Sequence, residues 1–274
     1  MATFRKSDAV LEARNLNKTY MQSSGFFVKK HKTIQALNNV SLTIKKGQTL
    51  AVVGESGSGK STLARCLLQL QPIDSGSVLF KGKNLATLSA KELKSVRRDI
   101  QMVFQDPYAS INPRMRIKEI IEEGLMIHEL GTTSERDKKV RSMIKKVGLS
   151  EADLVKYPHQ FSGGQRQRIG IARVLIMEPQ IVICDEPVSA LDVSIQAQIL
   201  LLLKELQKEF HLSYLFISHD LRVVRHIADE VVVMHQGKIV EQGTIKKVYE
   251  KPKENYTKEL LNAIPGGRFK FKLN

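Results

Sequence analysis

The sequence has few cysteines and no long apolar run. Its two cysteines, Cys66 and Cys184, both lie in apolar stretches, the usual setting of reduced and buried thiols. Two such residues make neither a disulfide framework nor a cysteine-ligated cluster, and they are typical of a cytosolic protein. The longest apolar runs, such as Ile199–Leu203, are far shorter than the ~20 residues that a transmembrane helix needs. We therefore expect a soluble chain that reaches a membrane only by docking.

The chain also lacks the usual signatures of secretion and of nucleic-acid binding. Its first residues, MATFRKSDAVLEARN, have no apolar core, so we expect no secretory signal. There are 43 basic and 28 acidic residues, a formal net charge of +15. This excess fits an anionic partner (phosphates, a membrane surface or nucleic acid) or simply a solvated basic surface. No arginine-rich run, zinc-ligand spacing or aromatic RNA-binding motif accompanies it, so we expect no nucleic-acid partner.

What is present begins with short strand-like segments. Apolar and polar residues alternate over Val10–Leu16, Ile34–Leu37 and Val40–Ile44, which predicts antiparallel strands separated by turns. The segment Met21–Lys32 is predicted to be an exposed loop. With 274 residues, 42% of them hydrophobic, the chain can bury a sizeable core.

Later segments alternate between strand and helix patterns. Thr49–Val53 predicts a buried strand, and Ser61–Leu70 has helical spacing. A charged, amphipathic helical region follows at about residues 114–177. Strand-like runs return at Ile181–Cys184, Tyr214–Ile217 and Glu230–His235. This order predicts an α/β fold with a mainly parallel sheet and an inserted helical subdomain.

The clearest chemical signal is the segment GESGSGKST, called here the phosphate loop. It matches G-x-x-x-x-G-K-[ST] between an expected strand and an expected helix. Its glycines allow backbone N–H groups to turn inward around an anion, and the helix start adds partial positive charge. Lys60 can bind the β- and γ-phosphates of ATP, and the Ser61 hydroxyl can hold Mg²⁺. The predicted nucleotide-binding residues are Gly54, Glu55, Ser56, Gly57, Ser58, Gly59, Lys60, Ser61 and Thr62.

Two carboxylates follow the apolar strand of IVICDEP. Ligands of parallel sheets bind beyond the carboxyl ends of the strands, which places Asp185 and Glu186 beside the phosphates. Asp185 can hold Mg²⁺, and Glu186 can polarise the attacking water. Alone, this pair is equally well explained as an acidic turn; the phosphate loop favours the catalytic interpretation.

Three single residues complete this predicted site. Gln105, in MVFQDP, offers an amide that can reach both the metal and the water. His219 follows the expected strand Tyr214–Ile217 and can contact the γ-phosphate. Tyr20 closes the strand NLNKTY and could stack on adenine. Each assignment depends on the other motifs, since a histidine or tyrosine at a strand end is usually structural.

A second anion site is predicted at Ser162, Gly163, Gly164 and Gln165, called here the serine–glycine segment. These residues open a helix in HQFSGGQRQRIGIARVLIMEP, so they offer N–H groups and a hydroxyl. One ATP does not need two phosphate sites in one chain. We therefore expect this segment to bind ATP that is held by a different subunit.

Taken in order, GESGSGKST, QDP, FSGGQ, CDEP, SALD and ISHD resemble the nucleotide-binding domain of ABC transporters. The resemblance covers about residues 10–245, and FSGGQ differs from the commoner LSGGQ only by Phe161. It implies an α/β fold: a P-loop NTPase core with a mainly parallel sheet, an antiparallel β subdomain and a helical subdomain inserted at about 114–177. It implies a nucleotide-binding domain over 8–250, with Glu186 as catalytic base, Asp192 at a dimer interface, and ATP and Mg²⁺ as cofactors.

A narrower resemblance points to oligopeptide and dipeptide importers. It is carried by RRDIQMVFQDPYASINPRM, by KPKENYTKELLNAIP and by the long segment after Tyr20. It implies a C-terminal extension of that type over 251–274, although the ending GGRFKFKLN has no cysteine, so no iron–sulfur cluster is expected. The implied partners are a second ATPase subunit (a related paralogue or a second copy), two transmembrane permease subunits and an external substrate-binding protein. The implied location is peripheral, on the cytoplasmic face of the cell membrane.

Three alternatives remain open at the level of sequence. The cargo could be an antimicrobial peptide, nickel or glutathione. The chain could be a soluble ABC ATPase of DNA repair or translation, although tandem domains and long coiled-coil insertions do not occur here. It could be a regulatory nucleotide binder without activity, against which the intact Lys60, Asp185, Glu186 and His219 argue.

Overall fold

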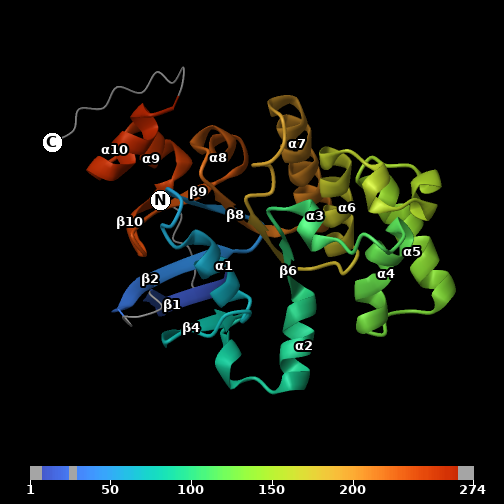
Figure 1. Ribbon diagram of the computed structural model, residues 1–274, viewed down its shortest axis with the longest axis horizontal. Helices are drawn as coiled ribbons and strands as arrows, with labels where there is room; N and C mark the ends of the chain where they lie inside the picture. The colour runs from blue at the N-terminus through green and yellow to red at the C-terminus, as the bar shows by residue number, and fades with distance from the viewer. Residues whose placement is uncertain (1–7, 25–29, 265–274) are drawn as a thin grey trace. The chain divides into compact units, whose positions relative to one another are not determined.

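The computed structural model describes residues 8–24 and 30–264. The chain divides into two compact units (Figure 1): unit 1 combines Met1–Leu93 with Tyr214–Asn274, and unit 2 is Lys94–Ser213. Residues 1–7, the first part of the segment in which no secretory signal was expected, and the tail GGRFKFKLN lie outside the described residues.

Unit 1 contains an antiparallel sheet with the strand order β2-β1-β4-β5. Its strands are β1 (Ala9–Ser24), β2 (Lys30–Lys45), β4 (Ser75–Phe80) and β5 (Lys83–Asn84). The antiparallel strands expected near the N-terminus are confirmed, but the loop predicted at Met21–Lys32 is wrong over most of its length. Backbone pairing continues from Met21 opposite Thr33 to Ser24 opposite Lys30, and residues 25–29 lie outside the described residues. Ladder hydrogen bonds join backbone groups, so polar residues can extend a strand without an apolar pattern.

Two asparagines explain why the sequence suggested two short strands where β2 is one. Asn15 and Asn39 both have positive φ, at 51° and 54°, and the β1–β2 register shifts on either side of Leu16. The Asn15 Nδ2 donates to Asn39 Oδ1 at 2.7 Å. Asparagine tolerates this left-handed conformation, which accompanies irregular strand pairing. The irregularity interrupts the alternation of residues while the strand itself continues.

The phosphate loop follows a second, mainly parallel group of strands in unit 1. Here β3 (Thr49–Val53) lies between β8 (Ser213–Ser218) and β9 (Glu230–His235), parallel to both, and β10 (Lys238–Thr244) is antiparallel to β9. All residues of β3 and β8 are buried, as apolar strands covered on both faces require. The three strands predicted in these places are confirmed.

The first helix of unit 1 is shorter than the sequence predicted. Helix α1 (Lys60–Leu67) buries Leu63 and Leu67, but Leu70 lies beyond its end and is 56% exposed. Gln69 has φ 54°, which breaks the right-handed helix before Leu70 can join the apolar face.

The remaining helices of unit 1 lie towards the C-terminus. They are α8 (Leu221–Ile227), α9 (Ile245–Glu250) and α10 (Asn255–Asn262). Figure 1 shows α9 and α10 side by side near β10. Between β5 and β6, η2 (Leu85–Thr87) precedes α2 (Ala90–Asp99), which crosses the boundary between the units.

Unit 2 consists of a parallel strand pair and helices. Strands β6 (Ile100–Val103) and β7 (Ile181–Asp185) pair in parallel, with Val103 opposite Cys184. Between them, residues 104–180 contain no strand in the part of the chain described. The helices of this unit are α3 (Pro107–Ser110), α4 (Ile117–Ile127), α5 (Thr133–Lys146), η3 (Glu151–Val155), η4 (Pro158–Gln160), α6 (Gly163–Leu175) and α7 (Val193–Phe210).

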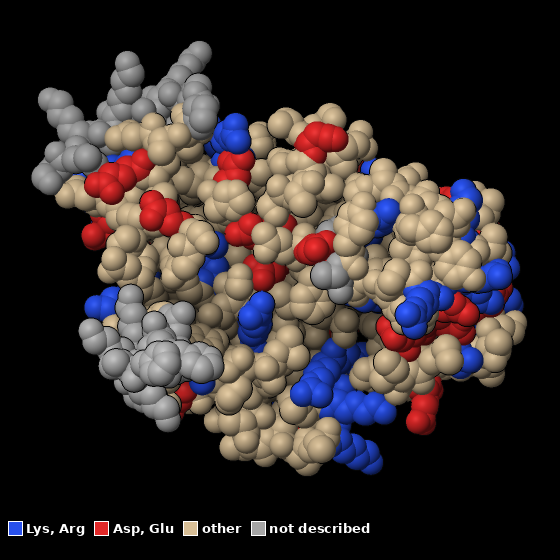
Figure 2. Space-filling view, in the orientation of Figure 1, with Lys and Arg blue, Asp and Glu red and all other residues tan. Residues whose placement is uncertain are grey.

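The burial of the two cysteines and the basic surface agree with what the composition predicted. Cys66 and Cys184 are free and buried, and burial raises the pKa of the Cys66 thiol to about 11. No helix among the described residues is long and apolar enough to cross a membrane. Figure 2 shows basic side chains gathered over α2, a helix that carries two lysines and two arginines and has no buried residue.

Candidate functional site

The phosphate loop needs glycine at two positions because other backbone lies against it. Gly54 has φ 149° and Gly59 has φ 105°, values that favour glycine. A Cβ atom at Gly54 would lie 2.2 Å from the carbonyl oxygen of Met234, and one at Gly59 would lie 2.3 Å from that of Ala36. The loop is thus packed between the end of β9 and the middle of β2, and side chains at these two positions would displace it.

Inside the loop, residues 55–58 form a tight turn. The Ser58 N–H donates to the Glu55 carbonyl at 3.2 Å, and Gly57 has φ 81°, as the third residue of a type II turn requires. The Ser58 carbonyl accepts from the Gly237 N–H at 3.0 Å. Ser58 itself is buried, whereas Glu55 is exposed. The turn is therefore held by the β9–β10 hairpin.

Lys60 is buried under this turn. Its ammonium donates to the carbonyl oxygens of Gly54 and Glu55, both at 2.8 Å, and lies 3.4 Å from Ser58 Oγ. Only 5% of the residue is exposed, so water screens its positive charge weakly and the charge acts strongly on groups inside the loop. A polyanion that entered the loop would meet this ammonium and the start of α1 together, which fits the predicted phosphate site.

The other two predicted residues of unit 1, His219 and Tyr20, belong to different sheets. Val53 of β3 is opposite Ser218 of β8, so the phosphate loop and the exposed His219 leave the same edge of the sheet. Tyr20 is half-buried on β1, with the Lys18 ammonium 5.6 Å from its ring centroid. It does not close its strand as predicted, because β1 continues to Ser24.

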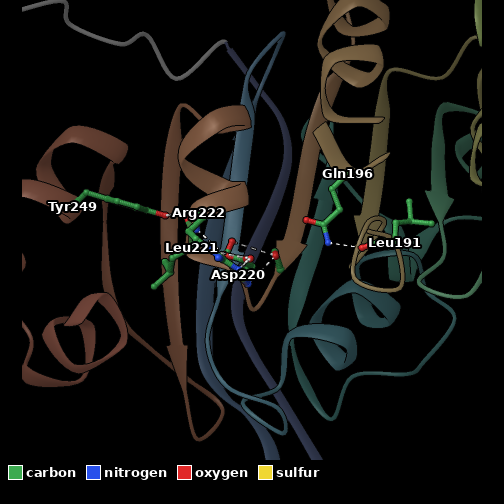
Figure 3. Close-up of polar contacts among 7 residues, drawn as sticks. Leu191, Gln196, Asp220, Leu221, Arg222 and Tyr249 are labelled. Carbon is green, nitrogen blue, oxygen red and sulfur yellow. Dashed lines mark hydrogen bonds and ion pairs between the residues drawn. The ribbon is translucent and has the colours of Figure 1, made fainter. Parts of the chain in front are cut away.

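The segment that carries His219 is anchored by residues that the sequence reasoning missed (Figure 3). Asp220 caps α8, accepting from the Arg222 N–H at 2.8 Å and from its guanidinium. Burial acts to raise the pKa of Asp220, but the bonds from Arg222 outweigh it and hold that pKa below its usual range. The Tyr249 hydroxyl donates to the Leu221 carbonyl at 2.6 Å. An aspartate directly before a helical apolar run was the available signal for the cap.

Unit 2 brings two of the predicted catalytic residues into contact. Because Val103 and Cys184 are paired, the residues after β6 and β7 leave one sheet edge. There the Gln105 side-chain amide donates to a Glu186 carboxylate oxygen at 3.2 Å. Glu186 has φ 48°, a strained conformation for a residue with a side chain, of the kind found at functional sites. Asp185, one residue earlier, is 6% exposed.

The serine–glycine segment begins helix α6 as predicted. Ser162 is its N-cap residue: its Oγ accepts from the Gln165 N–H at 3.3 Å, and the Gln165 side chain accepts from the Ser162 N–H at 2.9 Å. This reciprocal pair is a capping box. Ser162 and Gln165 are both exposed, so the segment is accessible within unit 2.

Close packing explains the second glycine of this segment. A Cβ atom at Gly164 would lie 2.5 Å from the Ile195 side chain of α7. The turn before α7 is held by Gln196, whose side-chain amide donates to the Leu191 carbonyl at 2.8 Å (Figure 3). Asp192 is the exposed N-cap residue of α7. The starts of α6 and α7 therefore belong to one packed region.

The predicted metal ligands have suitable chemistry. Ser61, Gln105 and Asp185 offer hydroxyl, amide and carboxylate oxygens, the donors that Mg²⁺ prefers alongside phosphate oxygens and water. Ser61 belongs to unit 1, and the other two belong to unit 2. No cluster of three or more histidine, cysteine, aspartate or glutamate side chains suited to a metal occurs in the described ranges.

One residue in contact with the phosphate loop was not predicted. The hydroxyl of Tyr256, on α10, accepts a hydrogen bond from the Glu55 N–H at 3.1 Å. The sequence placed Tyr256 in a tail characteristic of a family but gave no reason to connect it with a residue 201 positions away.

Comparison with known proteins gives consistent matches. The family model described as ABC transporter matches residues 37–189. The oligopeptide transport ATP-binding protein AppF of Bacillus subtilis is 50% identical over 264 residues, covering 96% of this chain and 80% of that protein. The di/tripeptide transport ATP-binding protein DppF of Pseudomonas aeruginosa is 49% identical, covering 94% and 80%. OppF of Haemophilus influenzae is 50% identical, covering 97% and 81%.

Solved structures agree with the fold. An ATP-binding cassette determined as a dimer in a post-hydrolysis state with ADP and Pi is 32% identical, with a TM-score of 0.74, covering 86% of this chain and 98% of that one. CbiO1 of Clostridium perfringens, part of the CbiONQ complex, is 30% identical, with a TM-score of 0.76, covering 94% and 96%. The expected α/β fold with a nucleotide-binding core is confirmed.

Proposed function

Because the chain belongs to the ABC transporter family and is an ATPase of that family, we propose that it drives peptide import. The observation that carries this proposal is the phosphate loop with its buried Lys60. This loop supports ATP as the source of energy for transport. The peptide cargo is supported by relatives named as oligopeptide, dipeptide and di/tripeptide transport proteins. We assign residues 8–250 to the nucleotide-binding domain, about 114–177 to its helical insertion and 251–274 to an importer-type extension.

In this proposal, unit 1 binds the nucleotide. Backbone N–H groups of the phosphate loop surround the β- and γ-phosphates, and the Lys60 ammonium exchanges its loop carbonyls for phosphate oxygens. Tyr20 stacks on the adenine. His219, which leaves the same sheet edge as the loop, contacts the γ-phosphate.

Unit 2 supplies the chemistry of hydrolysis. Glu186 acts as general base on the attacking water, and Gln105, already bonded to it, orients that water. Ser61, Asp185 and Gln105 would hold Mg²⁺, which when bound neutralises charge on the phosphates. The positive φ of Glu186 sets where its side chain leaves the backbone, and the hydrogen bond from Gln105 holds the carboxylate before ATP arrives.

A second ATPase subunit completes the site. The serine–glycine segment of each subunit binds the ATP held by the phosphate loop of the other, with Asp192 at their interface. The partner is a related paralogue or a second copy of this chain. Two permease subunits receive the resulting movement, and an external binding protein delivers the peptide. The chain would then lie on the cytoplasmic face of the membrane as a peripheral protein.

Uptake in cells tests this function. In cells that lack the gene for this chain, we expect the wild-type gene to restore uptake of labelled di-, tri- or oligopeptides. Glu186→Gln should bind ATP normally yet restore no uptake, since loss of a general base lowers hydrolysis by about 10²–10⁴-fold. Restored uptake of nickel or glutathione in place of peptides would contradict the cargo. Full uptake with Glu186→Gln would remove Glu186 from the role of base.

A further inference from the structure

The phosphate loop is in contact with the C-terminal helix of unit 1. The backbone N–H of Glu55 donates to the hydroxyl oxygen of Tyr256 at 3.1 Å. We propose that Tyr256 is a positioning residue: its hydroxyl fixes the peptide between Gly54 and Glu55 and thereby raises the affinity of the loop for ATP. This inference rests on the proposed assignment of the phosphate loop to ATP.

The peptide between Gly54 and Glu55 is held at both of its polar ends. Its carbonyl oxygen, on Gly54, accepts from the Lys60 ammonium at 2.8 Å, and its N–H group donates to Tyr256. When Lys60 turns to the phosphates, it releases the carbonyl. The Tyr256 hydroxyl then remains to hold this peptide, so the loop keeps its shape while ATP binds.

Ser58, the last residue of the same turn, is also connected to Tyr256, through the β9–β10 hairpin. The Ser58 carbonyl accepts from the Gly237 N–H at 3.0 Å, in the hairpin between β9 and β10. His235, two residues earlier, lies against Tyr256 with ring centroids 3.9 Å apart. The hydroxyl and the ring of one tyrosine thus support the first and the last residue of the turn, one directly and one through the hairpin.

Helix α10 is itself fixed, so Tyr256 has a defined position. The Glu241 carboxylate, 9% exposed on β10, accepts from the backbone N–H groups of Lys253 and Glu254 at 2.9 and 3.1 Å. Burial raises the pKa of the Tyr256 phenol, although the bond from Glu55 opposes this. The phenol therefore stays neutral at physiological pH, and its oxygen accepts the Glu55 N–H as a neutral acceptor. A rigidly held acceptor organises the loop before the ligand arrives, which improves affinity.

Substitution of Tyr256 by phenylalanine isolates the hydroxyl. Tyr256→Phe keeps the ring against His235 but removes the acceptor of the Glu55 N–H. One neutral hydrogen bond corresponds to about a threefold to tenfold change in affinity, so we expect the Kd and KM for ATP to rise by that factor. We expect kcat to change less than twofold, because Glu186 and Gln105 are untouched. The melting temperature should move little, because Glu55 is exposed and water can replace the lost partner.

The neighbouring Thr257 provides a matched control. Its hydroxyl lies on the same helix, is 1% exposed and has no hydrogen-bond partner in the part of the chain that the structure describes. Thr257→Val removes this hydroxyl at nearly constant volume. We expect its Kd for ATP to equal that of the wild type within twofold.

Two measurements decide the proposal: calorimetric titration with ATP, and amide hydrogen exchange of the nucleotide-free protein. We expect Tyr256→Phe to weaken ATP binding and to speed exchange of the Glu55 N–H, and Thr257→Val to do neither. An unchanged Kd in Tyr256→Phe, or an equal rise in both variants, would overturn the positioning role. If instead Lys60→Ala binds ATP as tightly as the wild type, the proposed phosphate site fails, and the Glu55 exchange rate alone then decides whether Tyr256 fixes the loop.

Discussion

Helices α1 and α6 both begin with glycine and serine around their first turn, but they are built differently. Helix α1 follows Gly59, which has no side chain to cap it, and its start is shaped by packed backbone and by the buried Lys60. Helix α6 follows Ser162, which caps the helix together with Gln165. The start of α6 therefore satisfies the N–H groups of Ser162 and Gln165 with its own side chains, whereas the start of α1 depends on its loop.

Because the two helix starts are built differently, we expect them to bind phosphate in different ways. The loop before α1 carries a buried positive charge, so it can bind ATP within one chain. The start of α6 has no acidic residue in its first turn, and it would have to exchange the bonds of its capping box for bonds to a phosphate. Such an exchange suits a site that is completed only when two subunits close.

Removal of Lys60 should have the larger effect on ATP affinity. Lys60→Ala deletes a charged donor, and a hydrogen bond to a charged group is worth about 1.5–3 kcal/mol, or about tenfold to more than a hundredfold in Kd. We expect calorimetry to show this weakening, together with loss of ATP hydrolysis. Unchanged affinity would contradict the assignment of the phosphate loop.

Ser162→Arg should have almost no effect on that affinity. Each monomer should bind one ATP with a Kd within about twofold of wild type, since the bonds within the phosphate loop are untouched. The long side chain should block closure on the partner, so gel filtration with ATP should show monomers and hydrolysis should be lost. A large loss of affinity in the isolated monomer would show that the two helix starts do not have separate roles.

Much of the fold could be predicted because apolar runs and turn residues act locally. Glu230–His235 was predicted with the bounds that the structure has, since buried parallel strands are continuous apolar runs. The pairing of Met21 with Thr33 could not be predicted from side chains, because ladder bonds join backbone atoms of polar residues. The exposure of Leu70 depends on the backbone conformation of Gln69, which no periodicity indicates.

The candidate site could be predicted where a motif is continuous in sequence. Lys60 and Ser162 were proposed from their immediate neighbours, and Glu186 from its place after an apolar strand. The positive φ of Glu186 and the bond between Glu55 and Tyr256 could not be found in this way. Both depend on tertiary packing between segments far apart in the chain, for which the sequence offers no local pattern.

The central claim is that each ATP is shared between the phosphate loop of one subunit and the serine–glycine segment of another. Mixing Ser162→Arg with Lys60→Ala tests it most directly. In a mixed pair of copies, one composite site carries both changes and the other carries neither, and the arginine faces the site left without ATP. We predict that each variant alone is inactive and that, provided the chain pairs with a second copy of itself, mixing restores part of the ATP hydrolysis. A Ser162→Arg protein that hydrolyses ATP at the wild-type rate as a monomer would contradict the claim.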